Sequence, residues 1–334
     1  MNGGAQTIQF HTKPVIIGGY SIVGPKEGEG PLRSYFDYVA KSDLFEQKSY
    51  EKAECKMHLL TIERAIDRVG LDEGDMCALL SGDLLNQIIS SSFSARELDI
   101  PFLGLYNACS TFGEGLCLAA VFISGGFMKR VAVSTSSHFS TAERQYRYPL
   151  ELGTQQPPTA QWTVTGCGCS VLADQGKGPC ITCATIGKVI DYGITDANNM
   201  GAAMAPAAAY TIAKHLEETG RSADYYDQII TGDLGIFGSE MLVELLRSEG
   251  IEISHRHVDC GKLIFSEKQK VHMGGSGAGC SSSVFNSLIL HEFSRGKLHR
   301  ILFVPTGALL SKDSSLQGES VPAIAHAVAI EEQV

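Results

Sequence analysis

Leu79-Leu80-Ser81-Gly82-Asp83-Leu84 is the stretch that decides the fold, because the chain repeats it. The same pattern returns 150 residues later as Ile229-Ile230-Thr231-Gly232-Asp233-Leu234. Each copy is an apolar strand that ends in Ser or Thr followed by Gly-Asp-Leu. Each is preceded by a segment with helical apolar spacing, over 53–69 and 204–216. Self-similarity over this distance predicts a chain built from two related halves.

A second pair of matching blocks follows the first pair. The sequence GFMKRVAV at 126–133 pairs with GKLHRILF at 296–303, which lies 170 residues later. Since the offset grows from 150 to 170, the second half carries an insertion between its two blocks. Apolar segments rich in small residues, over 111–124 and 279–293, predict a buried helix before each of these strands.

The repeated elements define a fold class and a boundary. Helices that alternate with near-continuous apolar strands predict an α/β fold with mixed sheets. A weaker pair of matching strands, over 169–173 and 325–330, closes each half. The turn-rich sequence DQGKGP at 174–179 predicts the boundary between an N-terminal half, 1–174, and a C-terminal half, 179–334. Two such halves in tandem predict a pseudo-twofold axis.

The composition restricts the possible functions. The chain has 334 residues, of which 44% are hydrophobic, and a formal charge of −10 from 27 basic and 37 acidic residues. An acidic chain without a Lys/Arg cluster along its sequence is a poor candidate for binding nucleic acid or anionic lipid. We expect no membrane-spanning segment and, from residues 1–14, no secretory signal. The ten cysteines lack zinc-ribbon spacing, so we expect reduced, buried thiols and no metal site.

A cysteine marks the predicted turn between a strand and a buried helix. The strand FLGLY covers 102–106, and NACST at 107–111 leads into the helix. Ser110 or Thr111 can cap this helix, which leaves its first N–H groups near the Cys109 sulfur. The helix dipole favours a thiolate at that position. We therefore expect Cys109 to be a site residue, and the alternative is a small buried hydrophobic side chain.

These features resemble the thiolase superfamily, which includes thiolases and ketoacyl synthases and places a cysteine at this turn. Within the superfamily, the chain is similar to the stage V sporulation protein AD family of endospore-forming bacteria, from about Gly24 to the C-terminus. The resemblance implies a thiolase-like fold of two duplicated α/β halves, layered helix, sheet, helix, sheet, helix. The segments that carry the resemblance are SGDLLNQ at 81–87, ACST at 108–111, SSHFSTAERQYRYP at 136–149, DYGITD at 191–196, MAPAAA at 204–209, GGSG at 274–277 and TGALLS at 306–311.

The resemblance also implies a function. It implies a non-catalytic protein that binds dipicolinic acid (pyridine-2,6-dicarboxylate), free or as the calcium chelate, and that needs no cofactor. It implies a subunit of a spore-membrane channel complex that supports dipicolinate uptake in sporulation and release in germination. The expected partners are integral membrane subunits of that complex and a second copy of this chain in a homodimer. The expected location is the cytoplasm or forespore, peripheral on the spore inner membrane through these partner proteins.

The catalytic groups of related enzymes are missing from this sequence. Ketoacyl synthases supply a His after a strand of the second half and a His or Asn in the following glycine-rich turn. Carried onto this chain, the first position falls at Asp233 and the second at Gly275 or Ser276. Neither position offers an imidazole, although His272 lies near the second. The second cysteine of degradative thiolases, expected near 307–309, is absent.

Two interpretations of the cysteine turn follow. An aspartate beside a thiolate adds like charge and raises the thiol pKa, so Asp233 indicates that Claisen chemistry is lost. Because Asp83 occupies the duplicate position, a purely structural role for both aspartates stays open. The alternative function is an acyl-CoA or acyl-carrier thioester enzyme, of the acyltransferase or condensing type, that uses Cys109.

A flat ligand with two carboxylates needs fixed hydrogen-bond donors. His138, Arg144 and Arg147 all follow the strand that ends near Thr135, and a guanidinium holds a carboxylate through two hydrogen bonds. The alternatives are a surface salt-bridge role for the two arginines and a buried, hydrogen-bonded core position for the histidine. The predicted ligand-binding residues are Cys109, Ser110, His138, Arg144, Arg147, Asp83, Asn86, Asp233 and Ser276.

Overall fold

One large mixed sheet runs through the molecule. The structure is a computed structural model that describes residues 5–147 and 149–333. The strand order is β11-β10-β13-β16-β9-β2-β8-β6-β4-β5, with β1 beside β9 and β3 beside β2. The strands of the sheet are β1 Thr7–Gln9, β2 Val15–Val23, β3 Tyr38–Val39, β4 Ala78–Gly82, β5 Phe102–Gly104, β6 Arg130–Ser137, β8 Gly166–Ala173, β9 Cys180–Thr185, β10 Gln228–Thr231, β11 His257–Asp259, β13 Arg300–Val304 and β16 Ala327–Glu331.

The two halves of the chain share one topology. The first half runs β2-β8-β6-β4-β5, and the second runs β9-β16-β13-β10-β11. In each half the second strand is antiparallel to both neighbours, and the remaining pairs are parallel. Leu79 lies opposite Ala132, and Ile229 lies opposite Leu302, so the pairing keeps both predicted offsets. The predicted duplication is confirmed.

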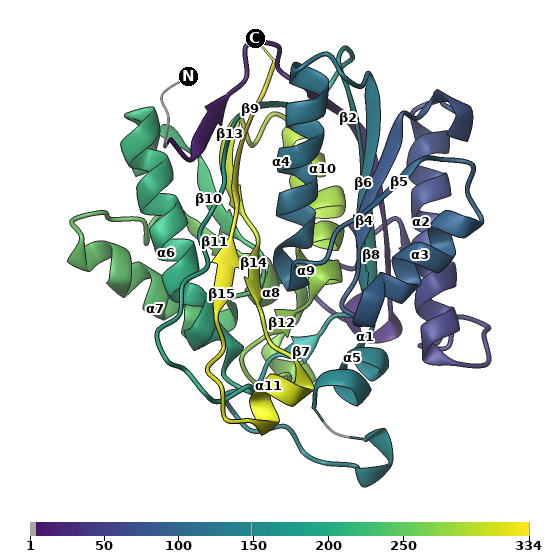
Figure 1. Ribbon diagram of the computed structural model, residues 1–334, viewed down its shortest axis with the longest axis vertical. Helices are drawn as coiled ribbons and strands as arrows, with labels where there is room; N and C mark the ends of the chain where they lie inside the picture. The colour runs from purple at the N-terminus through teal and green to yellow at the C-terminus, as the bar shows by residue number, and fades with distance from the viewer. Residues whose placement is uncertain (1–4, 148, 334) are drawn as a thin grey trace.

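Helices lie outside and between the two halves of the sheet (Figure 1). α4 and α9 lie between the halves, α2 and α3 cover the outer face of the first half, and α6 and α7 cover that of the second. This is the predicted order of helix, sheet, helix, sheet, helix. The helices are α1 Pro25–Gly28, α2 Tyr50–Arg68, α3 Ile89–Arg96, α4 Thr111–Ser124, α5 Phe139–Tyr146, α6 Met200–Thr219, α7 Gly235–Ser248, α8 Cys260–Ile264, α9 Ala278–Val284, α10 Leu290–Ser294 and α11 Lys312–Leu316. The remaining short strands are β7 Trp162–Thr163, β12 Gly275–Ser276, β14 Thr306–Ala308 and β15 Ala323–Ala325.

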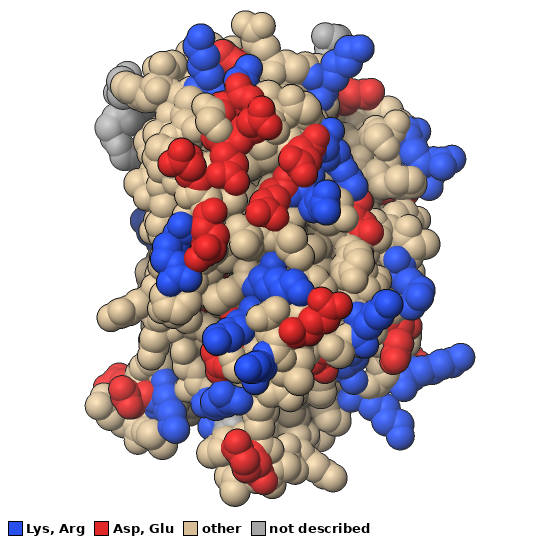
Figure 2. Space-filling view, turned by 90° about the vertical axis from the view of Figure 1, so that its right-hand side faces the viewer, with Lys and Arg blue, Asp and Glu red and all other residues tan. Residues whose placement is uncertain are grey.

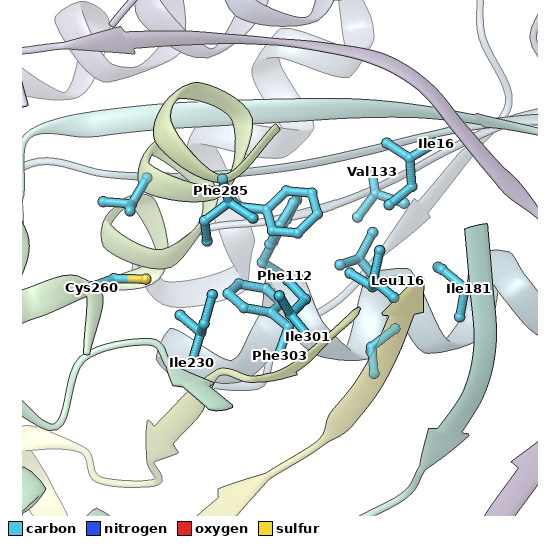
Figure 3. Close-up of a cluster of buried hydrophobic side chains, with 14 of the residues drawn as sticks. Ile16, Phe112, Leu116, Val133, Ile181, Ile230, Cys260, Phe285, Ile301 and Phe303 are labelled. Carbon is cyan, nitrogen blue, oxygen red and sulfur yellow. The ribbon is translucent and has the colours of Figure 1, made fainter. Parts of the chain in front are cut away.

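The main core lies between the halves and joins them (Figure 3). Phe112 on α4 lies 5.6 Å from Phe285, and Phe285 lies 4.9 Å from Phe303 on β13, measured between ring centroids. All three side chains are fully buried. Aromatic pairs at these separations stabilise a core beyond the effect of area burial alone. Because the first ring belongs to one half and the other two to the second, neither half buries its apolar face alone.

The structure refines two of the sequence predictions. The helix predicted over 279–293 is divided into α9, a π-helical turn at Phe285–Ile289 and α10. This turn contains the buried Asn286, whose Nδ2 donates to the Ser282 carbonyl oxygen and whose Oδ1 accepts from the Ser170 hydroxyl at 2.7 Å. Inserted side-chain hydrogen bonds of this kind commonly accompany π turns. The predicted boundary falls between β8 and β9, although β1 pairs with β9 of the second half.

Candidate functional site

The turn that carries Cys109 is strained and is held by hydroxyl groups. A 3-10 turn runs directly into α4. Ala108 has a φ of +49°, in the left-handed region that costs a residue with a Cβ about 1 to 2 kcal/mol. The Ser110 hydroxyl donates to the Asn107 carbonyl oxygen at 2.7 Å, and the Thr111 hydroxyl donates to the Ala108 carbonyl oxygen at 2.6 Å. The sequence therefore folds so that Cys109 lies at the N-terminus of a buried helix.

The Cys109 thiol faces a carboxylate from the second half. Burial, the charge of Asp233 and a hydrogen bond to Asp233 raise the pKa of the thiol well above its ordinary value. Burial also raises the pKa of Asp233 to about 7. The Asp233 carboxylate accepts from the Thr306 hydroxyl at 2.7 Å and from the Gly277 N–H at 3.2 Å. At neutral pH the sulfur is therefore a protonated thiol beside a carboxyl group that is close to half ionised, and a thiolate nucleophile is disfavoured.

His326, whose ring lies close to the Cys109 turn, has other hydrogen-bond partners. The groups that act on the Cys109 thiol include Asp233, Gly277 and Arg147, and no histidine is among them. His326 lies 3.0 Å from Asn107 Nδ2 through its Nε2 and accepts from the Gly187 N–H through its Nδ1. Within the part of the chain that the structure describes, no imidazole forms a hydrogen bond with the Cys109 sulfur, so the Cys-His pair of nucleophilic catalysis is not found here.

A cavity of about 440 Å³ opens in front of Cys109. It lies at the lower end of the molecule in Figure 1, where α5, α11, β7 and β12 meet. Both halves contribute to its walls, which are mainly apolar, with hydroxyl, amide and guanidinium groups among them. The residues that line it are Leu84, Asn86, Tyr106, Ala108, Cys109, Ala142, Tyr146, Arg147, Thr163, Ala197, Met200, Ser276, Gly277, Ala308, Leu309, Leu310, Ser311 and Ser314.

Arg147 supplies the positive charge of this cavity. It is the only Lys or Arg among the described lining residues, and its side chain is 8% exposed. Its guanidinium pairs with Glu143, whose Oε1 also accepts from Gln156 Nε2 at 2.9 Å. The pair holds the guanidinium in place. A guanidinium has five N–H donors, so donors remain for a ligand.

The comparisons with known proteins identify the family. The sequence model of the family described as "Stage V sporulation protein AD (SpoVAD)" matches residues 4–331. The chain is 45% identical over 328 residues to stage V sporulation protein AD of Bacillus subtilis (strain 168), which covers 98% of this chain and 97% of that protein. The chain belongs to the stage V sporulation protein AD family. Its role therefore lies in sporulation.

Solved structures of related fold are enzymes of the thiolase type. The 3-oxoacyl-[acyl-carrier-protein] synthase III of Aquifex aeolicus matches with a TM-score of 0.58 and 12% identity over 95% of this chain and 99% of that chain. Acetamide-bound OleA of Xanthomonas campestris matches with a TM-score of 0.61 and 15% identity over 97% of this chain and 100% of that chain. At this identity the likeness shows the thiolase-like fold alone, and that fold was the sequence prediction.

Five predicted site residues come together in this structure. Cys109, Asn86, Arg147 and Ser276 line the cavity, and Asp233 lies behind the sulfur, hydrogen-bonded to it. Ser110 lies beside Cys109, but its hydroxyl is directed to the backbone.

Asp83 is the duplicate of Asp233 and has a different neighbourhood. Its carboxylate accepts from the Leu85 N–H at 2.8 Å, and from the Ser91 N–H and hydroxyl at 2.7 and 2.8 Å. These bonds connect the end of β4 to α3 and use both carboxylate oxygens. The structure therefore gives Asp83 the anchoring contacts of the structural alternative, away from the cavity walls.

His138 and Arg144 also lie apart from the cavity walls. His138 is buried, accepts from the Ser140 N–H through Nδ1 at 3.1 Å and contacts the Asp43 carbonyl oxygen through Nε2 at 2.9 Å. Burial lowers its pKa, so it is neutral at pH 7. The exposed Arg144 pairs with Glu51 at 2.8 Å. Arg144 lies within α5, whereas Arg147 follows its last residue and has a non-helical backbone, with φ −121° and ψ −90°, so the two side chains reach different surroundings.

Several cavity residues carried no sequence signal. Tyr146 donates to the Leu84 carbonyl oxygen, and its hydroxyl lies 3.3 Å from that of Tyr106, which in turn donates to Asn86 Oδ1. A single tyrosine in a helix or a loop is typical of a core or surface position, so the sequence does not indicate that it lines a cavity. Their convergence depends on the packing of α5 against the turns after β4 and β5.

The described residues contain neither a membrane-spanning helix nor a metal-binding cluster. No helix within 5–147 and 149–333 is long and apolar enough to cross a membrane. In the same ranges, no group of three or more His, Cys, Asp and Glu side chains is arranged to hold a metal ion.

Proposed function

We propose that this chain is a non-catalytic dipicolinate-binding subunit of a spore-membrane channel complex, and that the cavity in front of Cys109 is its ligand site. One observation carries the proposal: a cavity lies in front of Cys109 at the N-terminus of α4, and the group that acts on its sulfur is the Asp233 carboxyl group and not an imidazole. A cavity of this size suits a small organic ligand.

The chemistry of the walls supports a flat, anionic ligand. Arg147 offers guanidinium donors to one carboxylate, and the hydroxyl groups of Ser276 and Tyr106 are further polar groups on the walls. Apolar side chains such as Leu84 and Met200 offer surfaces for the faces of a ring. Charge-assisted hydrogen bonds to a carboxylate in a partly dry site are strong. Arg147 is the single cation among the described lining residues, whereas dipicolinate is a dianion. The ligand is therefore either the free dianion or its calcium chelate, whose net charge is lower.

The test compares two arginines from one segment, Arg144 on α5 and Arg147 directly after it. We expect Arg147→Ala to weaken dipicolinate binding roughly tenfold to a hundredfold, because a buried, charge-assisted contact is lost. Arg144→Ala is the matched control, since its side chain pairs with Glu51 at the surface and affinity should change less than about twofold. Isothermal titration calorimetry with dipicolinate, with and without calcium, measures both.

The outcomes separate cleanly. No saturable binding to the unmodified protein would count against the function. Binding that Arg147→Ala leaves unchanged, or that Arg144→Ala weakens equally, would place the ligand elsewhere on the chain.

The alternative function is thioester chemistry, and the position of Cys109 at the N-terminus of α4 favours it. In that case incubation with acyl-CoA or acyl-carrier thioesters leaves a covalent acyl group on the Cys109 sulfur, with release of the carrier thiol. Intact-protein mass spectrometry detects such an adduct. We expect none over a panel of acyl groups, because the thiol is protonated at neutral pH.

The proposal includes partners and a place in the cell. We propose that integral membrane subunits of the same complex hold the chain on the spore inner membrane of the forespore, where it supports dipicolinate uptake in sporulation and release in germination. A homodimer is part of the proposal by analogy with the fold. Size-exclusion chromatography with light scattering tests the dimer.

A further inference from the structure

A second, larger hollow lies on the outer face of the first half, away from Cys109. It has a volume of about 640 Å³ and lies between β2, the segment 41–46 that follows β3, and one side of α2. Four of its lining residues are cationic, Lys41, Lys56, Arg64 and Arg68, and two are carboxylates. We call this surface the basic hollow. An excess of positive charge is notable on a chain whose formal charge is −10.

The α2 side of the basic hollow is a stripe of cations. Lys56, Arg64 and Arg68 are spaced by multiples of four residues, so they lie along one side of the helix. Figure 2 shows Lys and Arg side chains interspersed with Asp and Glu over the molecular face that carries this helix.

The floor of the basic hollow is aromatic and holds two of these cations. The Arg68 guanidinium lies over the Tyr20 ring at 4.6 Å and pairs with Asp37 at 2.7 Å. The Lys56 ammonium lies over the Phe45 ring at 4.9 Å and pairs with Glu46 at 2.9 Å. These two side chains are therefore part of the wall.

The other two cations are available to a partner. Arg64 has only a long contact to Asp67, at 3.8 Å, and its side chain is 61% exposed. Lys41 has no ion pair among the residues that the structure describes.

The loop in the wall is conformationally strained. Phe45 and Glu46 have φ values of +44° and +61°, in the left-handed region that side chains other than glycine rarely adopt. The Phe45 ring packs edge-on against Tyr38 at 5.9 Å, and Tyr38 is 42% exposed. Backbone strain that packing holds in place is commonly found at recognition surfaces. Here it keeps an aromatic ring and a lysine at the rim of a hollow that is open to a partner.

We propose that the basic hollow is a docking surface for an acidic segment of a partner protein, with carboxylates against Lys41 and Arg64 and an apolar or aromatic side chain against Tyr38 and Phe45. Charge complementarity selects this occupant, because the rest of this acidic chain repels a negatively charged segment. The surface is separate from the ligand cavity, so the inference does not depend on dipicolinate binding.

The test reverses the two available charges. Fluorescence anisotropy at low salt measures binding of a labelled peptide of repeated Glu-Glu-Phe units. The variant Lys41→Glu with Arg64→Glu should lose affinity roughly tenfold, since each attraction becomes a repulsion of similar size. The control, Lys13→Glu with Arg295→Glu, makes the same change in net charge at exposed residues outside the hollow and should change affinity less than about twofold. A Glu-Glu-Ser peptide should bind more weakly than the Phe peptide.

Three results would overturn the inference. They are no binding of the Glu-Glu-Phe peptide, equal losses in the two double variants, and binding instead to phosphatidylglycerol vesicles that depends on Lys41 and Arg64. Dipicolinate calorimetry on the same variants keeps the two proposals apart. The hollow variant should retain dipicolinate binding, and Arg147→Ala should retain peptide binding.

Discussion

At the residue scale, the Asp233 carboxyl group controls the ionisation of the thiol in the Cys109 turn. Asp233 acts on Cys109 through its charge and a hydrogen bond, and both raise the thiol pKa. The helix N-terminus acts in the opposite direction, because its dipole favours a thiolate. In this chain burial and the aspartate outweigh the helix, so the turn has the geometry of a nucleophile without its ionisation.

This balance predicts a change in reactivity. Asp233→Asn removes the like charge while keeping the shape of the side chain, so the pKa of Cys109 should fall and alkylation by iodoacetamide at pH 8 should become roughly tenfold faster. Peptide mass spectrometry after timed quenching measures the rate at this site. Asp83→Asn, at the duplicate position, should leave that rate unchanged. An equal acceleration in both variants would mean that general loosening, and not charge, controls the sulfur.

The sequence predicted part of the site. Cys109 and Asp233 were predicted because a motif and a repeat place them at the ends of strands. Arg144 and Arg147 share one segment and one residue type, so sequence alone gave no reason to separate them. The ion pair of Arg144 with Glu51, which lies on α2, removes it from the cavity, and that contact depends on tertiary packing.

At the element scale, close approach of α4 to the sheet depends on small side chains. A Cβ built on Gly115 would lie 2.6 Å from Val133 Cγ1 on β6, which is shorter than van der Waals contact. The bounds of this helix, Thr111–Ser124, were predictable because its small, apolar composition is unbroken. The sequence did not predict the π turn at Phe285–Ile289, which depends on where Asn286 finds hydrogen-bond partners.

Helix propensity and packing therefore oppose each other at Gly115. Alanine is the better helix former by about 1 kcal/mol, yet Gly115→Ala should lower the free energy of unfolding by about 1 to 3 kcal/mol because β6 must shift. Gly74→Ala is the control, since nothing lies within 4 Å of the added Cβ. Urea unfolding followed by circular dichroism measures both. A stabilised Gly115→Ala would show that the helix moves at little cost.

The short helix α1 contains a buried acid with an unusual pKa. Burial raises the pKa of Glu27 from 4.5 to about 8; one carboxylate oxygen accepts from the Thr165 N–H at 3.0 Å, and the other has no partner among the described residues. Between these pH values the folded state holds a proton that the unfolded state has released. The stability of the unmodified protein should therefore fall as the pH rises from about 4.5 through 8.

Glu27→Gln should remove this contribution. Relative to the unmodified protein, the variant should gain about 1 to 3 kcal/mol of unfolding free energy between pH 5 and pH 8. Urea unfolding at both pH values measures the gain, with Glu29→Gln, an exposed neighbour, as the control. Parallel pH dependence of the three proteins would contradict the assignment.

At the scale of the whole molecule, the shared core makes the two halves one cooperative unit. The ring of Phe112 packs against Phe285 and Phe303 of the other half, so separation of the halves exposes all three. Trp162, the only tryptophan, lies on β7, which pairs with β12 of the second half, so its fluorescence reports on the contact between the halves, while far-ultraviolet circular dichroism reports on the secondary structure of both.

We therefore expect coincident unfolding midpoints by tryptophan fluorescence and circular dichroism. Phe285→Ala should lower the free energy of unfolding by about 3 to 5 kcal/mol, because it leaves a cavity between the halves. Both denaturant midpoints should therefore fall together. Denaturant titrations followed by both signals test this. A fluorescence midpoint that stays unchanged while the dichroism midpoint falls would show that the halves unfold separately.

The duplication is complete in topology but not in chemistry. Asp83 and Asp233 end equivalent strands, yet the first anchors a loop and the second touches a sulfur. The chain therefore carries two copies of the same turn with different contacts: one carboxylate binds the N–H and hydroxyl groups of Ser91, and the other faces the Cys109 thiol. Both halves contribute to the one cavity in front of Cys109, so the binding stoichiometry should be one ligand per polypeptide, not two.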